Sequence, residues 1–275
     1  MAFARLLALL AALAATAAAA AELRLGATHT LQDSGILAVL LPAFEATAGL
    51  KVKPLVAGTG QVIKYAENGD VDVVFTHSRT DEERLVARGI GKARADVMHN
   101  DFVIAGPPED PARVRGMADA AAALRRIREA GAKFVSRGDD SGTHKRELQL
   151  WQAAGGHRPW AGYLSAGQGS ARAVMMAYEL DAYTLVDRAS LRSLARRQPL
   201  APLVQGDARL LNEYGVTTLR AAPQRAVNER DGERFAAWLV SDAARRIIAG
   251  YRIDGEPAFR LPPAPRGAPA PRPAP

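Results

Sequence analysis

The apolar residues of this chain fall into two alternating patterns: short continuous runs, and longer stretches at helical spacing. Leu23–Ala27 and Val71–Phe75 are short runs bounded by polar turns, which is typical of strands. Asp33–Thr47 carries apolar residues at helical spacing and stops at Gly49, which predicts a helix. The first third of the chain therefore predicts a β-α-β-α-β order, typical of a parallel sheet with helices on its faces.

The same alternation continues to about residue 250. We expect strands at Leu23–Ala27, Val52–Val56, Val71–Phe75, Phe102–Ala105, Lys133–Ser136, Tyr183–Val186, Leu200–Val204 and Tyr214–Leu219. We expect helices at Asp33–Thr47, Val62–Glu67, Asp81–Arg88, Asp119–Ala130, His144–Ala153, Arg172–Leu180, Leu191–Arg196, Glu233–Val240 and Ala243–Ala249. This pattern predicts an α/β fold with two units of similar size. In such sheets, ligands bind at the carboxyl ends of strands, in the loops that begin helices.

The two ends of the chain differ from its middle. Residues 1–21 combine Arg5 with a Leu/Ala core and a small-residue end, which predicts a secretory signal peptide rather than a membrane anchor. Its strongly apolar part, Leu6–Leu13, is short of the ~20 residues that cross a bilayer. Residues 256–275 hold 8 of the 17 prolines, and we expect them to form an exposed, disordered tail outside the fold.

Composition narrows the classes of function. The 275 residues include no cysteine, which excludes disulfides, thiolate metal sites, a catalytic thiol and a lipid anchor on an N-terminal Cys. With the signal peptide, this predicts a protein free in the periplasm. The net charge of +7 comes from 30 Arg and 6 Lys and favours an anionic partner. With 6% aromatic residues and no basic-aromatic platform, we expect no nucleic-acid binding.

Three of the predicted strand-to-helix loops are rich in hydroxyls and glycine: Ala27–Gly35, Gly58–Gln61 and Ser136–His144. A helix start has unpaired N–H groups and the positive end of the helix dipole, so it suits anions. Arg137 adds a permanent cation that can donate two parallel hydrogen bonds to an oxyanion. Any one of these loops has an ordinary reading as a helix cap. Three of them, spread over both units, favour a shared anion site.

Other arrangements of polar residues give weaker evidence of a functional site. The five histidines are scattered and include no HExxH motif, so we expect no metal site and no cofactor. Asp139 and Asp140 are adjacent, which does not suit a general acid and base pair. A secreted hydrolase would need an oriented base beside a nucleophile, and Ser141 with His144 at one helix start fits this poorly. We therefore expect a binding protein and not an enzyme.

Several longer motifs run through nearly the whole chain after the predicted signal peptide, up to about Gly255, among them QDSGILAVLLPAFEATAG, NDFVIAGP and SRGDDSGTHK. In these motifs it resembles the extracytoplasmic tungstate-binding proteins of tungstate ABC transporters, which are two-lobed periplasmic binding proteins. The resemblance implies two lobes, each a mixed sheet flanked by helices, joined by a two-strand hinge. It places residues 22–104 and 214–255 in lobe 1, residues 105–213 in lobe 2, and the crossings near Val103–Gly106 and Asn212–Gly215.

The resemblance also implies which residues bind the anion. Lobe 1 would supply Thr28 and Thr30, with Thr59 nearby, and lobe 2 would supply Arg137, Ser141, Gly142 and Thr143, with Arg188 as a second cation. The first loop departs from the family's usual TTTS, because it reads Ala27-Thr28-His29-Thr30. His29 is therefore a further candidate, able to add a charge when protonated or one hydrogen bond when neutral.

The resemblance predicts an oxyanion ligand and a membrane permease as partner, with the protein itself a monomer. Tungstate is expected first, with molybdate and phosphate as alternatives, and a sensory role in place of transport also stays open. Phosphate usually keeps a proton at neutral pH, so its site needs an acceptor, whereas tungstate needs donors only. The choice between phosphate and tungstate therefore depends on where the carboxylates of Asp139 and Asp140 point.

Overall fold

The computed structural model describes residues 22–194 and 200–262, so the predicted signal peptide and the chain beyond Pro262 lie outside it. The strands are β1 (Glu22–Thr28), β2 (Lys51–Ala57), β3 (Val73–Thr76), β4 (Gly91–Gly106), β5 (Phe134–Ser136), β6 (Tyr163–Ser165), β7 (Tyr183–Asp187), β8 (Ala201–Val204), β9 (Leu211–Leu219), β10 (Arg252–Ile253) and β11 (Glu256–Pro257). The helices are α2 (His29–Asp33), α3 (Leu37–Ala48), α4 (Thr59–Asn68), α5 (Arg79–Ala87), α6 (Ala120–Glu129), α7 (Gly142–Ala153), α8 (Ser170–Glu179), α9 (Arg188–Leu194), η1 (Ala208–Leu210), α10 (Glu229–Leu239) and α11 (Asp242–Gly250).

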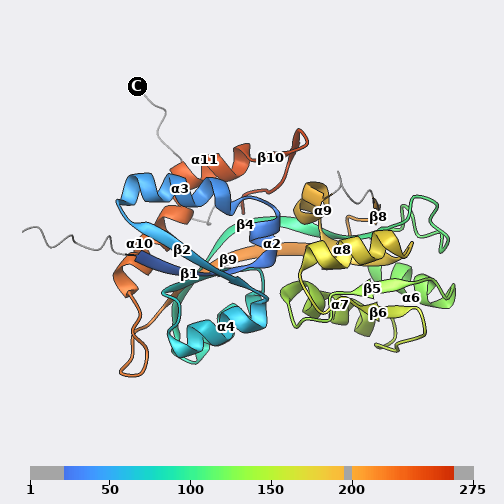
Figure 1. Ribbon diagram of the computed structural model, residues 1–275, viewed down its shortest axis with the longest axis horizontal. Coiled ribbons are helices and arrows are strands. Elements are labelled where there is room, and N and C mark those ends of the chain that lie inside the picture. Colours follow the sequence, from blue (N-terminus) through green and yellow to red (C-terminus); the bar gives the residue numbers. More distant parts are fainter. Residues whose placement is uncertain (1–21, 195–199, 263–275) are drawn as a thin grey trace, which may run out of the picture.

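Nine strands form one mixed sheet in the order β2-β1-β3-β9-β4-β7-β5-β6, with β8 also paired to β4. The β1–β2 and β1–β3 pairs are parallel, as are β5–β6 and β5–β7. The central strands β9 and β4 run antiparallel to their neighbours. Helices cover both faces of this sheet, and Figure 1 shows α3, α10 and α11 on one side of β1 and β2 and α4 on the other. The α/β prediction is therefore confirmed.

Strand β4 joins the two sections of the sheet. Its first part, Gly91–Asp101, pairs with β9, and its last part, Phe102–Gly106, pairs with β7 and β8. In Figure 1, β4 and β9 run between the group of elements around β1 and the group around β5. We call these groups the first and the second section. The first contains β1–β3, α2–α5, α10 and α11, and the second contains β5–β8 and α6–α9.

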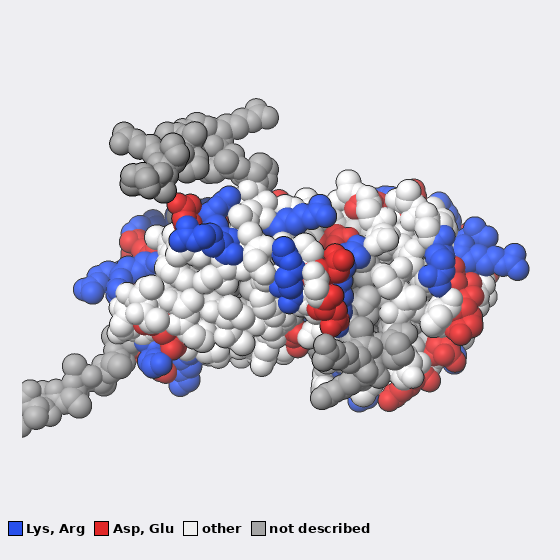
Figure 2. Space-filling model, turned by 90° about the horizontal axis from the view of Figure 1, so that it is seen from above, with Lys and Arg blue, Asp and Glu red and all other residues white. Residues whose placement is uncertain are grey.

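The surface carries charges of both signs. On the face shown in Figure 2, the described Lys and Arg residues lie among Asp and Glu rather than in one basic patch. The net positive charge is therefore not gathered on this face as a nucleic-acid surface would require. Residues 22–194 and 200–262 include no helix that is long and apolar enough to cross a membrane.

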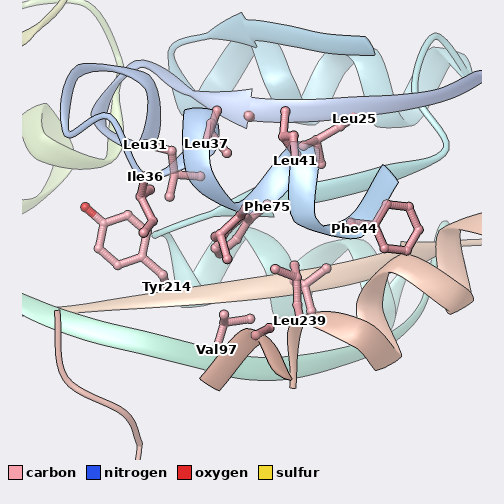
Figure 3. Close-up of a cluster of buried hydrophobic side chains, with 14 of the residues drawn as sticks. Leu25, Leu31, Ile36, Leu37, Leu41, Phe44, Phe75, Val97, Tyr214 and Leu239 are labelled. Carbon is pink, nitrogen blue, oxygen red and sulfur yellow. The ribbon is translucent and has the colours of Figure 1, made fainter. Parts of the chain in front are cut away.

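Buried side chains fill both faces of each section. In the first section, Leu25 and Phe75 from the sheet pack with Leu41 and Phe44 of α3 (Figure 3). The Phe44 and Phe235 rings meet edge to face with centroids 5.0 Å apart. The opposite face buries Val62 and Val71 with their neighbours. Each large apolar side chain buried in this way stabilises the fold by about 1.5–3 kcal/mol. The second section has its own two clusters, around Trp151 and around Val174.

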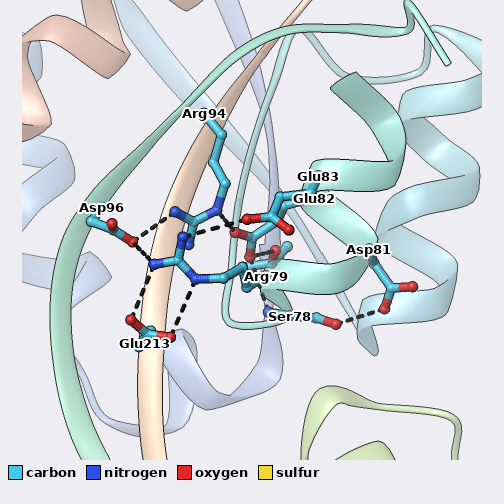
Figure 4. Close-up of polar contacts among 9 residues, drawn as sticks. Ser78, Arg79, Asp81, Glu82, Glu83, Arg94, Asp96 and Glu213 are labelled. Carbon is cyan, nitrogen blue, oxygen red and sulfur yellow. Dashed lines mark hydrogen bonds and ion pairs between the residues drawn. The ribbon is translucent and has the colours of Figure 1, made fainter. Parts of the chain in front are cut away.

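The largest difference from the expected elements is the length of β4. The sequence predicts only Phe102–Ala105, because the preceding residues 92–96 carry charges at alternate positions. Those charges are paired in the fold (Figure 4): Arg94 Nε donates to Glu82 Oε2 at 2.6 Å and Arg94 Nη1 to Asp96 Oδ1 at 2.6 Å. The charged side chains on one face of the strand therefore have charged partners and no apolar layer above them, so hydrophobic periodicity does not reveal the strand.

The predicted start of the tail needs a correction. The sequence places residues 256–275 outside the fold, but Glu256–Pro257 pairs with Arg252–Ile253, and Phe259 is buried. The backbone groups of His99 and Arg260 exchange two hydrogen bonds of 2.8 Å. Phe259 packs edge to face on Tyr214, with ring centroids 5.5 Å apart, and this burial outweighs the effect of the surrounding prolines. The packed chain thus continues beyond the expected boundary at Gly255.

Candidate functional site

Several helices begin around one cavity between the two sections. Helices α2, α4, α7 and α8 follow β1, β2, β5 and β6, which run parallel to their neighbours. Their N-termini therefore meet at the carboxyl edges of the two sheet sections. The cavity has a volume of about 290 Å³ and is lined by His29, Gly58, Asp139, Gly167, Gln168 and Gly169. Unpaired N–H groups at helix starts make such a place favourable for a small anion.

The first loop brings Thr28, His29 and Thr30 to this edge of the sheet. Thr28 has an extended backbone and precedes the first turn of α2. Among the described residues, Thr28 Oγ1 and His29 Nδ1 are buried atoms without a hydrogen-bond partner. The His29 ring lies 3.7 Å from where a Cβ on Gly169 would stand, so residues of both sections meet at the cavity. Two buried polar groups of this loop are thus free to bind a ligand.

The starts of α4 and α7 contact each other directly. The Gly142 N–H donates to Thr59 Oγ1 at 3.0 Å, so the Thr59 hydroxyl keeps its own hydrogen for another partner. Ser141 is the N-cap of α7, and its Oγ accepts from the His144 N–H at 3.2 Å. Thr143 Oγ1 is buried and, within the described chain, has no hydrogen-bond partner. The hydroxyls of Thr59 and Thr143 can therefore still donate, whereas the Ser141 hydroxyl is directed to the Asp139 carboxylate.

Arg137 is 2% exposed and extends from the end of β5. Its Nη1 donates to Ser170 Oγ at 2.8 Å, while Nε and Nη2 donate to Asp139 Oδ2 at 3.1 and 2.6 Å. The loop turns sharply at Gly138, whose φ of +58° favours glycine, and a side chain there would collide with Ser165. Arg137 is thus a fixed, buried cation beside the cavity wall formed by Asp139.

The two adjacent aspartates have different surroundings. Asp139 Oδ1 accepts from the Ser141 N–H at 3.1 Å, so both of its oxygens are occupied. Burial alone would raise the pKa of the Asp139 carboxyl, but the Arg137 charge and these hydrogen bonds outweigh it, and the pKa lies below its usual range. The Asp140 side chain is 75% exposed, with Lys145 Nζ 3.9 Å away. Asp139 therefore offers no free acceptor to the cavity. Asp140 is not part of the cavity lining, and its carboxylate lies beside Gly60 at the start of α4.

His77 lies beneath the site and fixes the hydroxyl of Thr30. The Asn212 amide nitrogen donates to Asp187 Oδ2 at 2.8 Å, so Asn212 Oδ1 faces His77 Nδ1, 2.9 Å away, and accepts from it. His77 Nε2 then accepts from Thr30 Oγ1 at 2.9 Å. Burial lowers the pKa of the His77 imidazole to about 4, so the ring is neutral at neutral pH. Thr30 therefore gives its hydroxyl hydrogen to His77 and not to the cavity.

Sequence reasoning missed His77 and the loop Gly167–Ser170. Both carried the same signal as the three loops it selected, because each directly follows a strand and contains hydroxyls or glycine. It also left out the carboxyl of Asp33, which lies close to Arg137 and Ser170. Burial raises the pKa of the Asp33 carboxyl, against the lowering effect of these neighbours.

The structure does not bring Arg188 to this cavity. Its Nε and Nη2 donate to the two oxygens of Asp101 at 2.6 and 2.5 Å, and Nη2 also donates to Gln205. It lines a different, larger cavity of about 670 Å³ between β4, α9 and the C-terminal segment. The candidate anion site therefore keeps one arginine, Arg137.

Two other kinds of site find no support in the described part of the chain. Within it, no three His, Cys, Asp or Glu side chains gather as a metal site would require. Ser141 and His144 do not form a nucleophile and base pair, because His144 Nδ1 accepts from the Asp140 N–H at 3.1 Å instead of from Ser141 Oγ.

A sheet with helices on both faces and a cavity where helix N-termini meet is the arrangement of a binding protein for a small anion. A family model described as a PBP superfamily domain matches residues 14–243. The chain belongs to this superfamily.

Individual relatives narrow the family further. The "Tungstate-binding protein TupA" of Peptoclostridium acidaminophilum is 38% identical over 86% of this chain and 84% of its own. The solved "tungstate ABC transporter from Geobacter sulfurreducens" is 42% identical, with a TM-score of 0.77 over 84% of this chain and 98% of that one. The tungstate-binding protein TupA from Desulfovibrio alaskensis is 37% identical, with a TM-score of 0.74 over 88% and 99%. Within the superfamily, the chain is a homologue of the TupA proteins.

Proposed function

We propose that this protein captures a tetrahedral oxyanion, tungstate first and molybdate second, and delivers it to the membrane permease of an ABC transporter. The proposal rests on the relatives, whose names state tungstate binding and transport. Two of those relatives are named as binding proteins, and we assign this chain to the same, non-enzymatic class. Residues 1–21 would direct the chain to the periplasm.

The observation that carries the choice of anion is that Asp139, the carboxylate in the cavity lining, has both oxygens occupied. The buried Asp33 carboxyl near Arg137 is not part of that lining. Asp139 is held by Arg137 and the Ser141 N–H, and Asp140 is exposed. Hydrogen phosphate would leave its proton without an acceptor, which costs several kcal/mol in a buried place, whereas unprotonated tungstate needs donors alone. In our proposal these donors are Thr28, Thr59, Arg137 and the Ser141–Thr143 turn, with His29 at the wall.

We also propose that the two sheet sections act as lobes that close on the anion. Residues 22–104 and 214–255 would form one lobe and residues 105–213 the other, with the hinge in β4 and β9. The position at which β4 changes partners, Asp101 to Phe102, supports this division. The cavity wall supports it too, because His29 and Gly58 come from one section and Asp139 and Gly167–Gly169 from the other.

Calorimetric titration of residues 22–275 with tungstate, molybdate, sulfate and phosphate tests the function. We expect tight binding of tungstate and molybdate and no binding of phosphate at pH 7.5. Sulfate is a smaller dianion that also carries no proton, so its affinity shows how far binding depends on the size of the anion and not on its charge alone. Tight phosphate binding without a tungstate signal would overturn the choice of anion. If none of the four anions binds, the proposal that the protein binds an oxyanion is overturned.

A further inference from the structure

One ion pair crosses between the two sections next to the proposed anion site. Lys145 Nζ of α7 donates to Asp81 Oδ2 of α5 at 2.8 Å. The Asp81 side chain is 7% exposed and that of Lys145 31%, so solvent screens the pair less than it screens an ion pair at the open surface. Lys145 stands one turn into α7, three residues after Gly142, whose N–H binds Thr59 of the first section. Two polar contacts therefore dock the start of α7 onto the first section.

Asp81 is held rigidly on its own side, as Figure 4 shows. Ser78 Oγ donates to Asp81 Oδ2 at 2.6 Å. The next residue, Glu82, accepts from Thr76 Oγ1 at 2.6 Å and from the Ser78 N–H at 2.9 Å. Arg94 of β4 donates to Glu82 Oε2, which ties the start of α5 to the sheet. The carboxylate that receives Lys145 is thus fixed before the two sections meet, so little side-chain freedom is lost when the pair forms.

We propose that Asp81 and Lys145 are positioning residues that hold the start of α7 over the bound oxyanion, and so set how slowly the anion leaves. This inference rests on the proposed function. Neither residue lines the cavity, so both act through the Ser141–Thr143 turn. The pair forms only when the two sections are together, so its loss favours separation of the sections and changes the rate of release more than the rate of capture.

The sequence offers matched variants for a test. Lys145→Gln removes the charge, and Asp81 keeps Arg84, whose Nη1 lies 2.9 Å from Asp81 Oδ1, so no bare buried carboxylate remains. Lys145→Arg keeps the charge. Lys51→Gln is the control, because Lys51 and Glu45 form an ion pair of the same 2.8 Å length within the first section. Asp81→Asn, alone and with Lys145→Gln, completes a double-mutant cycle.

The measurements are the dissociation rate of tungstate by stopped-flow competition, and the radius of gyration by X-ray scattering in buffer without added oxyanion. We expect Lys145→Gln to release tungstate about fivefold faster and to have the larger radius of gyration. Lys145→Arg and Lys51→Gln should stay within twofold of the wild type. The double variant should release the anion no faster than the faster of the two single variants.

An unchanged release rate in Lys145→Gln would overturn the inference, as would equal effects of the Gln and Arg variants or additive effects in the cycle. The radius of gyration is measured without added oxyanion, so it tests the ion pair independently of the proposed function. If no anion binds the wild type, the proposed function fails, and an equal radius of gyration in wild type and Lys145→Gln then also overturns the pairing role.

Discussion

Gly142 stands where the two sections touch, and Gly142→Ala should weaken tungstate binding while leaving the fold intact. A Cβ at this position would lie 2.8 Å from His77 Cε1 and 3.2 Å from Thr59 Oγ1. Ordinary contacts between carbon atoms begin at about 3.5 Å, so the added Cβ would be roughly 0.7 Å too close to His77 Cε1. His77 cannot turn away, because both ring nitrogens are hydrogen-bonded. The start of α7 must therefore move away from the first section.

That movement has a calculable effect. The hydrogen bond from the Gly142 N–H to Thr59 Oγ1 would stretch from 3.0 Å to about 3.7 Å, beyond hydrogen-bonding distance. Overpacking of this kind costs about 1–3 kcal/mol, which corresponds to a roughly 5- to 150-fold loss of affinity. Alanine is a better helix former than glycine, so the melting temperature without anion should stay equal or rise slightly.

Calorimetry with tungstate and thermal melting without it measure the two effects separately. Gly250→Ala is the control, because Gly250 also lies at a helix terminus, as the last residue of α11, and a Cβ there would meet no atom within 4 Å. A dissociation constant for Gly142→Ala within twofold of the wild type would refute the reasoning. A large fall in melting temperature would also refute it, because the clash would then lie within the fold and not between its sections.

Three further predictions concern the site and its supports. Arg137→Gln should weaken tungstate binding more than tenfold in calorimetry, since charge-assisted hydrogen bonds contribute ~1.5–3 kcal/mol, and an unchanged affinity would make Arg137 a purely structural residue. His77 has a pKa of about 4 in the fold and 6.5 when unfolded, so the unfolded chain takes up the proton first and stability falls between pH 6.5 and 4. Between pH 6.5 and 4, the free energy of unfolding measured in urea should fall by about 3 kcal/mol less in His77→Gln than in the wild type. Equal falls in the two proteins would contradict this prediction. Glu82→Gln should lower the free energy of unfolding by about 3 kcal/mol, because it removes the buried carboxylate that pairs with Arg94. Asp96→Asn removes a partner of Arg94 that is 41% exposed and should cost under about 1 kcal/mol, and equal effects of the two variants in urea unfolding would contradict this.

The sequence predicted most of the fold because each element carried its own local signal. The helix expected to stop at Gly49 ends there, with Gly49 at a φ of 61°. The expected strands β1 and β2 pair in parallel, as do β5 and β7, whereas the short strand β6 was not predicted. The first two-thirds of β4 stayed hidden, because Glu82 and Arg79, which bind Arg94 and Asp96, come from α5, and no pattern within the strand itself records them.

The candidate site was only partly predictable. Hydroxyls and glycine after strands marked Thr59 and Ser141–Thr143, which the structure brings to one junction. Arg188 has the right charge and also stands at a helix start, but sequence alone cannot show that Asp101 holds it elsewhere. The use of the Thr30 hydroxyl by His77 depends on Asn212, 135 residues beyond His77, and such a long-range orientation leaves no trace in local spacing.

The place of β9 in the sheet fixes when the chain can finish folding. It lies between β3 and β4, and its pairing of Gly215 with Thr76 joins residues about 140 positions apart. Until residues 211–219 have been synthesised, β3 and the first part of β4 each have an unpaired edge and cannot form their final ladder. A closing contact of such long range makes folding slow and concentrates it at the end of synthesis. The edges of β3 and of the first part of β4 therefore stay open, and available for incorrect pairing, until β9 is in place.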